Sequence, residues 1–181
     1  MKRGYLSFPR AAVLAVATGV MLVTGTTQVR GVLPEAEPDL ADDSQLQLEL
    51  QLERGRYLTR IAGCNDCHTR GFAERHGQVP EAQWLTGDTL GWRGPWGTTY
   101  PANLRKSLSQ LSEEQWLQLA RTIQTRPPMP WFVLRDMSDE DLRAIYKFVR
   151  HLEPSTEPVP VYVPPDREPS PPYLMLVSPT P

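Results

Sequence analysis

The sequence predicts an all-α domain of about three main helices, preceded by an N-terminal export segment and followed by an extended, proline-rich tail. Two observations lead to this prediction. Three stretches have the composition, periodicity or caps of helices, at residues 45–62, 113–125 and 138–152. After residue 153 the chain holds ten prolines and no helical or strand pattern of useful length, so polyproline II is expected there.

The composition bounds the size and class of the protein. With 181 residues, of which 40% are hydrophobic, the chain suits one modest domain with extensions. Its formal net charge of -2 argues against a nucleic-acid partner. We therefore divide the chain into an export segment, an acidic linker, a domain and a tail, at residues 1–30, 31–44, 45–153 and 154–181.

The export segment begins with Lys2, Arg3 and Arg10, and residues 11–29 that follow carry no charge. This is the pattern of an export signal. The uncharged stretch is close to the about 20 residues that a membrane helix needs, so a cleaved signal and a retained membrane anchor are both open. In either case the basic residues at the start place the rest of the chain outside the cytoplasm, in an oxidising periplasmic compartment.

The helix expected at residues 45–62 has an unusual leucine pattern. Leucine occupies every second position from residue 46 to residue 52, which by itself would indicate a strand. Leucine, glutamine and glutamate are good helix formers, however, and no second strand is evident. Gly55 would cost ~1 kcal/mol relative to alanine inside a helix, a cost that makes sense if another helix crosses closely there. The expected buried stripe is Leu50, Tyr57, Leu58 and Ile61.

Two further helices carry clear start signals. Ser112 with Gln115 three residues later forms a capping box, and Ser138 with Asp141 repeats the pattern. The second of these helices is the expected partner of Gly55. The positions expected to be buried are Trp116, Leu119, Ala120 and Ile123 in the first helix and Leu142, Ile145, Tyr146, Val149 and Leu152 in the second.

Between the helices expected at residues 45–62 and 113–125 lies the motif Cys64-Asn65-Asp66-Cys67-His68, which has the form C-x-x-C-H. This spacing is typical of covalent haem attachment, in which two thiols add to the haem vinyl groups and the adjacent imidazole ligates the iron. A thioredoxin-like redox pair would need a βαβ pattern around it, and the surroundings are helix and loop. A zinc site would need a second pair of ligands, but the chain has only two cysteines.

The segment from residue 69 to residue 110 is rich in glycine and proline, so we expect it to wrap around a bound group. Its aromatic residues could form the apolar wall of a haem crevice or simply an aromatic core; they are Trp84, Trp92, Trp96 and Tyr100. An indole N–H could also reach a haem propionate. Arg93 and Arg105 are candidate partners of the propionates, with a solvated surface position as the alternative.

Met129 is the candidate for the second axial ligand. It stands in the run Pro127-Pro128-Met129-Pro130-Trp131, where the prolines exclude a helix interior and hold the thioether on a stiff loop. Simple packing of the loop is the alternative. The other methionines and histidines outside the C-x-x-C-H motif have no such proline framing; they are Met1, Met21, Met137, Met175, His76 and His151.

Several of these motifs together resemble class I c-type cytochromes. They are GRYL at residues 55–58 ahead of the C-x-x-C-H motif, GTTYPAN at 97–103, MPW at 129–131 and SDEDL at 138–142. More narrowly, the chain is similar to single haem domains of the multi-haem cytochrome subunits of bacterial membrane-bound alcohol and gluconate dehydrogenases. It departs from them in having one haem motif and in the run Leu104-Arg105-Lys106 after Asn103.

The resemblance implies a cytochrome c fold around one covalent haem c. Cys64 and Cys67 would be the thioether anchors, His68 the proximal ligand and Met129 the distal ligand. A haem whose iron has both axial positions filled suits one-electron transfer between redox protein partners, so we expect an electron carrier and not an enzyme. Two alternatives remain: a haem enzyme or sensor with an open or displaceable sixth ligand, and a fixed electron-transfer subunit of a dehydrogenase or oxidase complex. Membrane association would come through the N-terminal segment.

Overall fold

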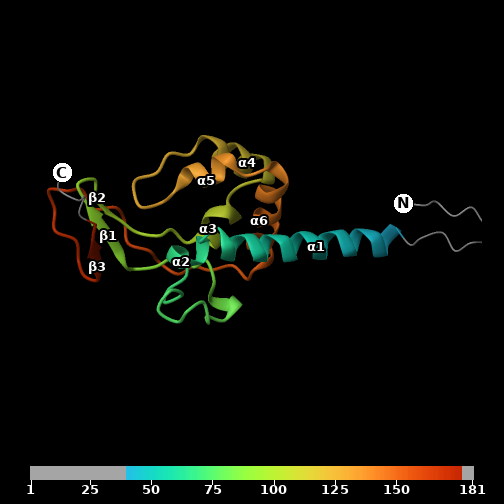
Figure 1. Ribbon diagram of the computed structural model, residues 1–181, viewed down its shortest axis with the longest axis horizontal. Helices are drawn as coiled ribbons and strands as arrows, with labels where there is room; N and C mark the ends of the chain where they lie inside the picture. Colours follow the sequence, from blue (N-terminus) through green and yellow to red (C-terminus); the bar gives the residue numbers. More distant parts are fainter. Residues whose placement is uncertain (1–39, 177–181) are drawn as a thin grey trace, which may run out of the picture. The chain divides into compact units, whose positions relative to one another are not determined.

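The computed structural model describes residues 40–176, so the predicted export segment and most of the predicted linker lie outside the described residues. The described part is mostly helical, with six α-helices and one small sheet (Figure 1). The helices are α1 Leu40–Ile61, α2 Cys64–His68, α3 Leu104–Ser109, α4 Glu113–Thr122, α5 Trp131–Asp136 and α6 Asp139–His151. The strands are β1 Gly91–Gly94, β2 Gly97–Thr99 and β3 Tyr173–Met175. No helix within residues 40–176 is long and apolar enough to cross a membrane.

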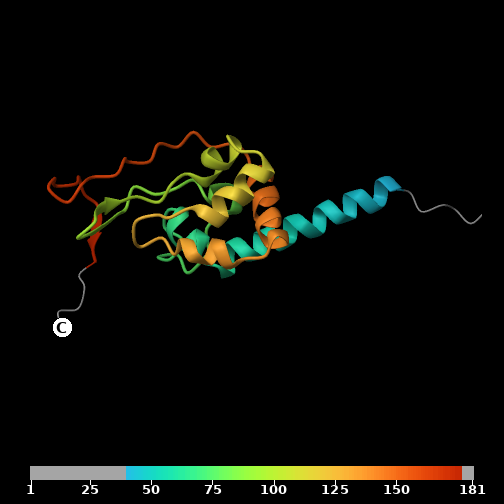
Figure 2. The same ribbon diagram turned by 90° about the horizontal axis from the view of Figure 1, so that it is seen from above.

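Helices α1 and α6 pack closely against each other in both views (Figures 1 and 2). A side chain on Gly55 of α1 would overlap the carbonyl oxygen of Ala144 and lie 2.6 Å from Cβ of Phe148. The absence of a side chain on Gly55 is therefore what allows the two helices to approach. This confirms the predicted crossing, and α1 begins at Leu40, five residues before the expected start.

The predicted buried stripe of α1 is wrong at three of its four positions. Leu50, Tyr57 and Ile61 are 55%, 60% and 61% exposed, and Leu58 alone is half-buried. Within residues 42–61 of this helix, the buried positions are Gly55 and Thr59. Because Gly55 must face α6, it sets the rotation of the helix, and Tyr57 and Ile61 are turned away from the core.

The predicted start signals of α4 and α6 are confirmed. The hydroxyl of Ser112 accepts from the backbone N–H of Gln115 at 3.2 Å, and the side-chain oxygen of Gln115 accepts from the N–H of Ser112 at 2.8 Å. The hydroxyl of Ser138 accepts from the N–H of Asp141 at 3.1 Å. Helix α4 ends at Thr122, three residues earlier than expected.

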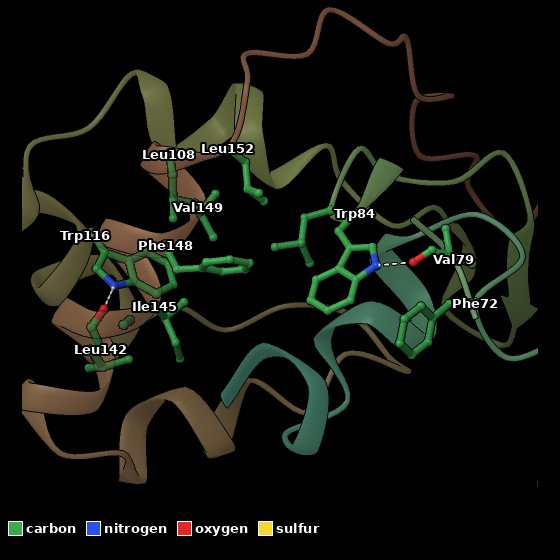
Figure 3. Close-up of a cluster of buried hydrophobic side chains, with 12 residues drawn as sticks. Phe72, Val79, Trp84, Leu108, Trp116, Leu142, Ile145, Phe148, Val149 and Leu152 are labelled. Atoms are coloured by element: carbon green, nitrogen blue, oxygen red, sulfur yellow. Dashed lines mark hydrogen bonds between the residues drawn. The ribbon is translucent and has the colours of Figure 1, made fainter. Parts of the chain in front are cut away.

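The hydrophobic core includes four side chains of α6 and two tryptophans (Figure 3). The indole N–H of Trp116 donates to the carbonyl of Leu142 at 2.8 Å, and that of Trp84 donates to Val79 at 2.8 Å. Trp84 makes edge-to-face contacts with Phe72 and with Phe148, which is fully buried although the predicted stripe of α6 omits it. Trp84 is thus a core residue whose indole N–H already has a partner.

The sheet corrects the prediction of a purely α-helical domain. Strand β1 pairs with β2 as an antiparallel hairpin and with β3 in parallel, so the strand order is β2-β1-β3. Strand β3 belongs to the tail, where we expected no strand. It pairs Tyr173 with Gly91, and the tail therefore packs along the hairpin (Figure 2).

Candidate functional site

The motif Cys64-Asn65-Asp66-Cys67-His68 is itself helix α2, a single turn that follows α1 after a glycine. Gly63 has a φ of 74°, a left-handed conformation that glycine adopts without strain and that reverses the chain between the two helices. Positions three apart share one face of a helix, so both thiols lie on the same side of this turn. The geometry of α2 suits attachment of one flat group through two neighbouring thiols.

Both cysteines are free thiols in partly buried positions. Burial raises the pKa of Cys64 to about 11, and it also raises the pKa of Cys67. A redox-active C-x-x-C pair needs a cysteine whose pKa is lowered so that it attacks as a thiolate. The surroundings of these thiols have the opposite effect, which argues against the thioredoxin-like alternative.

The zinc alternative also lacks its further ligands. In the part of the chain that the structure describes, no cluster of three or more histidine, cysteine, aspartate and glutamate side chains could hold a metal ion. A structural zinc site takes four such ligands. The two thiols are therefore not part of a zinc-type cluster among these residues.

His68 is held in one orientation and one tautomer. The residue is 9% exposed, and Nδ1 of its ring lies 2.7 Å from the carbonyl oxygen of Ala102. A carbonyl can only accept, so Nδ1 carries the proton and Nε2 is left with its lone pair. Burial lowers the pKa of His68, which keeps the ring neutral at pH 7. A neutral imidazole whose other nitrogen donates to a carbonyl is the usual arrangement of a metal-ligating histidine.

The backbone of His68 is fixed as firmly as its ring. Its carbonyl accepts from the N–H of Gly87 at 2.8 Å. Gly87 has a φ of 83°, and a side chain there would lie 2.9 Å from both the carbonyl oxygen of Pro101 and the N–H nitrogen of Asn103. Gly87 is thus confined between His68 and the segment that holds the ring of His68. The sequence marks it only as one of many glycines.

Asn65 and Thr69 form a buried link that sequence reasoning missed. Asn65 is fully buried, and its side-chain oxygen accepts from the hydroxyl of Thr69 at 2.7 Å. The oxygen of Thr69 in turn accepts from the N–H of Leu85 at 2.7 Å. This chain of bonds fastens α2 to the segment that follows Trp84. Positions between the two cysteines carry no signal for such a role.

Met129 lies, as expected, in the loop between α4 and α5 and is partly buried. The hydroxyl of Thr99 donates to the carbonyl of Pro127 in this loop at 2.8 Å. Residues 99–102 span three Cα steps, at most about 11 Å, and end at the carbonyl that binds His68. One short segment therefore contacts the Met129 loop at one end and His68 at the other.

The tail contacts the same loop. The guanidinium of Arg126 lies 4.0 Å from the ring centroid of Tyr162, and the hydroxyl of Tyr162 donates to the carbonyl of Trp96 at 2.8 Å. Thr98 and Val163 exchange two backbone hydrogen bonds of 2.7 and 3.0 Å, which attach the tail to β2. The tail thus secures the loop three residues before Met129.

Two indole nitrogens near this tail contact are buried without a partner. Nε1 of Trp92 and Nε1 of Trp96 are both shielded from solvent and form no hydrogen bond within residues 40–176. Buried polar atoms nearly always have a partner, so an orphaned donor indicates an acceptor absent from the protein. A carboxylate-bearing group such as haem, with its propionates, would supply such acceptors. Nδ2 of Asn65, within α2, is a third buried donor without a partner among residues 40–176. These orphaned donors and the donor set of α2 fit a haem.

Arg93, Arg105 and Asn103 are committed to the protein itself. Arg105 is 5% exposed, so the alternative prediction of a solvated surface position is wrong for this residue. Its guanidinium donates to the carbonyl of Trp84 at 2.7 Å and to the carbonyls of Glu81 and Glu153 at 2.9 Å. Arg93 donates to the carbonyl of Arg167 at 2.8 Å and to the hydroxyl of Thr98 at 3.3 Å. Asn103 caps α3 and donates to Ser155. These contacts join the domain to its tail.

Comparison with known proteins shows a distant similarity to a cytochrome subunit. The chain is 27% identical, over 154 residues, to a fructose dehydrogenase cytochrome subunit from Gluconobacter japonicus. The match covers 79% of this chain and 28% of that protein, so the chain spans little more than a quarter of the relative's length. No protein-family model matches the chain. No solved structure matches it either. This distant similarity points to a c-type cytochrome domain, with which the spacing of Cys64 and Cys67 is compatible.

Proposed function

We propose that this chain is a single-haem c-type cytochrome that transfers one electron at a time between redox protein partners outside the cytoplasmic membrane. The observation that carries the proposal is the state of His68. Its ring is buried, neutral and anchored through Nδ1 to Ala102, and it lies in the same helical turn as two free thiols. These are the features that a haem ligand next to two thioether anchors requires.

Each residue of the site has a distinct role in the proposal. The thiols of Cys64 and Cys67 would hold the haem covalently, and Nε2 of His68 would ligate the iron on one side. The thioether of Met129 would be the ligand on the other side. Haem held in this way supplies a one-electron iron couple whose potential methionine ligation raises. The indole N–H groups of Trp92 and Trp96 are available to donate to propionates.

Filled axial positions favour a carrier over an enzyme. With His68 and Met129 both bound to the iron, no coordination position would remain for a substrate, and a rigid site would limit rearrangement when the charge changes. His68 is fixed by Ala102 and Gly87, and the Met129 loop is fixed by Thr99. The similarity to a cytochrome subunit agrees with this role. Electron-transfer partners commonly meet through interfaces below about 1,200 Å².

A second form of the proposal is that the chain works as a fixed subunit of a dehydrogenase complex. The relative is by name a dehydrogenase cytochrome subunit, and this supports a permanent partner. The chemistry of the haem site would be unchanged, and the difference lies in what the protein binds. Purification from its native membrane would retain a larger redox subunit in this case and would yield the cytochrome alone if the chain is a free carrier.

Covalent attachment can be tested by denaturing electrophoresis with a haem stain. We expect the wild-type chain to keep its haem after denaturation and the Cys64→Ala, Cys67→Ala double variant to lose it, because no thioether bond can then form. The His68→Ala variant should lose low-spin haem, whereas the matched His76→Ala variant, altered at an exposed histidine, should keep it. Purification of a wild-type chain that carries no haem would contradict the proposal.

A further inference from the structure

Helix α1 carries an apolar stripe that faces solvent. Leu46, Leu50, Tyr57 and Ile61 are 53%, 55%, 60% and 61% exposed. At 100° per residue these four positions lie within an arc of about 60° on the helix surface. Gly55, which faces α6, lies on the opposite side. The stripe therefore consists of two exposed apolar pairs, Leu46 with Leu50 and Tyr57 with Ile61, on one side of the helix. Glu53 and Arg54 flank the gap between the pairs. Exposed apolar surfaces of this kind mark interaction sites.

The N-terminal half of α1 is exposed to solvent. All residues from 42 to 50 are exposed, and both views show this half extending beyond α6 (Figures 1 and 2). A helical segment of this length is marginal in water without packing along one face. The exposed half of α1 would gain most from a second helix alongside it.

The spacing of the stripe is symmetric along the helix. Leu46 and Leu50 are four positions apart in the sequence, and so are Tyr57 and Ile61. The centre of the pattern falls between Glu53 and Arg54. An antiparallel copy of the same helix would place Leu46 opposite Ile61 and Leu50 opposite Tyr57. Two-fold symmetry would repeat each of these contacts with the two copies exchanged. A surface that matches itself in this way gives a closed two-fold interface.

Away from the two-fold axis, the charges of α1 have the same antiparallel match. From residue 42 to residue 53 the helix has four acidic and no basic residues, and from 54 to 61 it has three basic and no acidic residues. Glu49 and Arg60 lie on the same flank of the stripe, and neither has an ion-pair partner among residues 40–176. An antiparallel copy would place them within about one helical turn of each other, whereas a parallel copy would oppose like charges.

We propose that α1 is a self-association surface through which two copies of this chain pair in antiparallel orientation, about a two-fold axis between Glu53 and Arg54. The structure also offers space at the end of the stripe. A hollow of about 410 Å³ adjoins Ile61 and is lined by Phe72, Ala73 and His76 among others. Leu46 of the second copy would lie at its rim. The two α2 helices would be at opposite ends of the pair, about 30 Å apart along the helix axis.

Sedimentation equilibrium of the full-length, haem-loaded protein from about 1 to 200 µM measures this association. We expect a monomer–dimer equilibrium, with Leu50→Glu and Tyr57→Glu each raising Kd at least about 30-fold because a charge would be buried at the centre of the stripe. Leu48→Glu is the matched control, since Leu48 is also exposed, at 42%, but lies on the other side of the helix. Its Kd should change less than about threefold. Haem content and helical circular dichroism verify that each variant is folded.

Cross-linking tests the orientation. In the antiparallel pair, Glu53→Cys would lie beside its twin and cross-link, whereas Leu46→Cys would be about 22 Å from its twin along the axis and would not. Glu49→Arg should weaken the dimer, and addition of Arg60→Glu should restore it. A monomer at all concentrations, a dimer that the stripe variants leave unchanged, or equal cross-linking at positions 46 and 53 would each overturn the proposal.

Discussion

Gly55 of α1 lies against the backbone carbonyl of Ala144 in α6, with no room for even a methyl group between them. This contact determines which side of α1 faces the core, and so it also determines the position of α2, which follows after Gly63. The haem motif is thus located by a close helix crossing nine residues before Cys64.

The crossing predicts that Gly55→Ala destabilises the protein. Alanine favours an isolated helix by about 1 kcal/mol over glycine, but overpacking here forces α1 and α6 apart. We expect a net loss of about 1–3 kcal/mol in the free energy of unfolding, measured by urea denaturation. Gln47→Ala, at an exposed position of the same helix, should change it by less than about 0.5 kcal/mol. A more stable Gly55→Ala variant would show that the helices do not meet at this point.

The ion pair between Arg54 and Asp141 predicts a pH-dependent contribution to stability. Arg54 donates to Asp141 at 2.7 Å, and this hydrogen bond holds the pKa of Asp141 below its usual value. Because the pKa of Asp141 is lower in the folded than in the unfolded protein, the ion pair stabilises the fold fully above about pH 4. This stabilisation is lost as the pH falls through the folded-state pKa of Asp141. Asp141→Asn should therefore cost about 1 kcal/mol at pH 7 and little at pH 2. The cost should also shrink in an Arg54→Met background. A cost that is equal at both pH values would contradict this assignment.

The tail contact predicts that Tyr162 supports ligation by Met129. Tyr162→Leu removes both the contact with Arg126 and the hydrogen bond to Trp96, and Tyr162→Phe removes the hydrogen bond alone. We expect the methionine ligand to be lost at lower temperature in both variants, more so for Leu, corresponding to about 1–2 kcal/mol for the larger change. The sulfur-to-iron absorption band follows this loss. Tyr173→Leu, which removes a hydroxyl bonded to Glu168, is the control and should leave the band unchanged.

Arg105 should be required for stability and not for electron transfer. Its guanidinium satisfies three backbone carbonyls in a nearly buried position, so Arg105→Met leaves buried acceptors without donors. We expect a loss of about 3 kcal/mol in unfolding free energy. Arg105→Lys should recover little of it, because an ammonium cannot reproduce the planar fork. Arg150→Met, at an exposed site, is the control. An unchanged denaturation midpoint in Arg105→Met would contradict the role.

The sequence predicted best those features that depend on neighbouring residues. The caps at Ser112 and Ser138 use partners three residues away, and both formed as expected. The C-x-x-C-H motif likewise places its own ligands within one turn. The crossing at Gly55 could be predicted because a glycine inside a helix has a cost that only a close contact offsets.

Features that depend on distant partners could not be predicted. Leucines at alternate positions spread around α1, so the pattern alone could not tell which side would face α6. Strands of three or four residues leave no periodicity, and β3 pairs with β1 from the far end of the chain. Arg105 was expected near a propionate or in solvent, yet its partners come from segments 21 to 48 residues away.

In the proposed function, His68 and Met129 would both ligate the iron of a haem held by α2. This ligation can be tested with an optical spectrum of the haem-loaded protein, ferric and then ferrous with carbon monoxide. We predict a sulfur-to-iron charge-transfer band in the ferric form and no shift with carbon monoxide, with the band lost in Met129→Ala and kept in Met175→Ala. A high-spin spectrum that shifts readily with carbon monoxide would contradict the account and would point to small-molecule chemistry at an open iron.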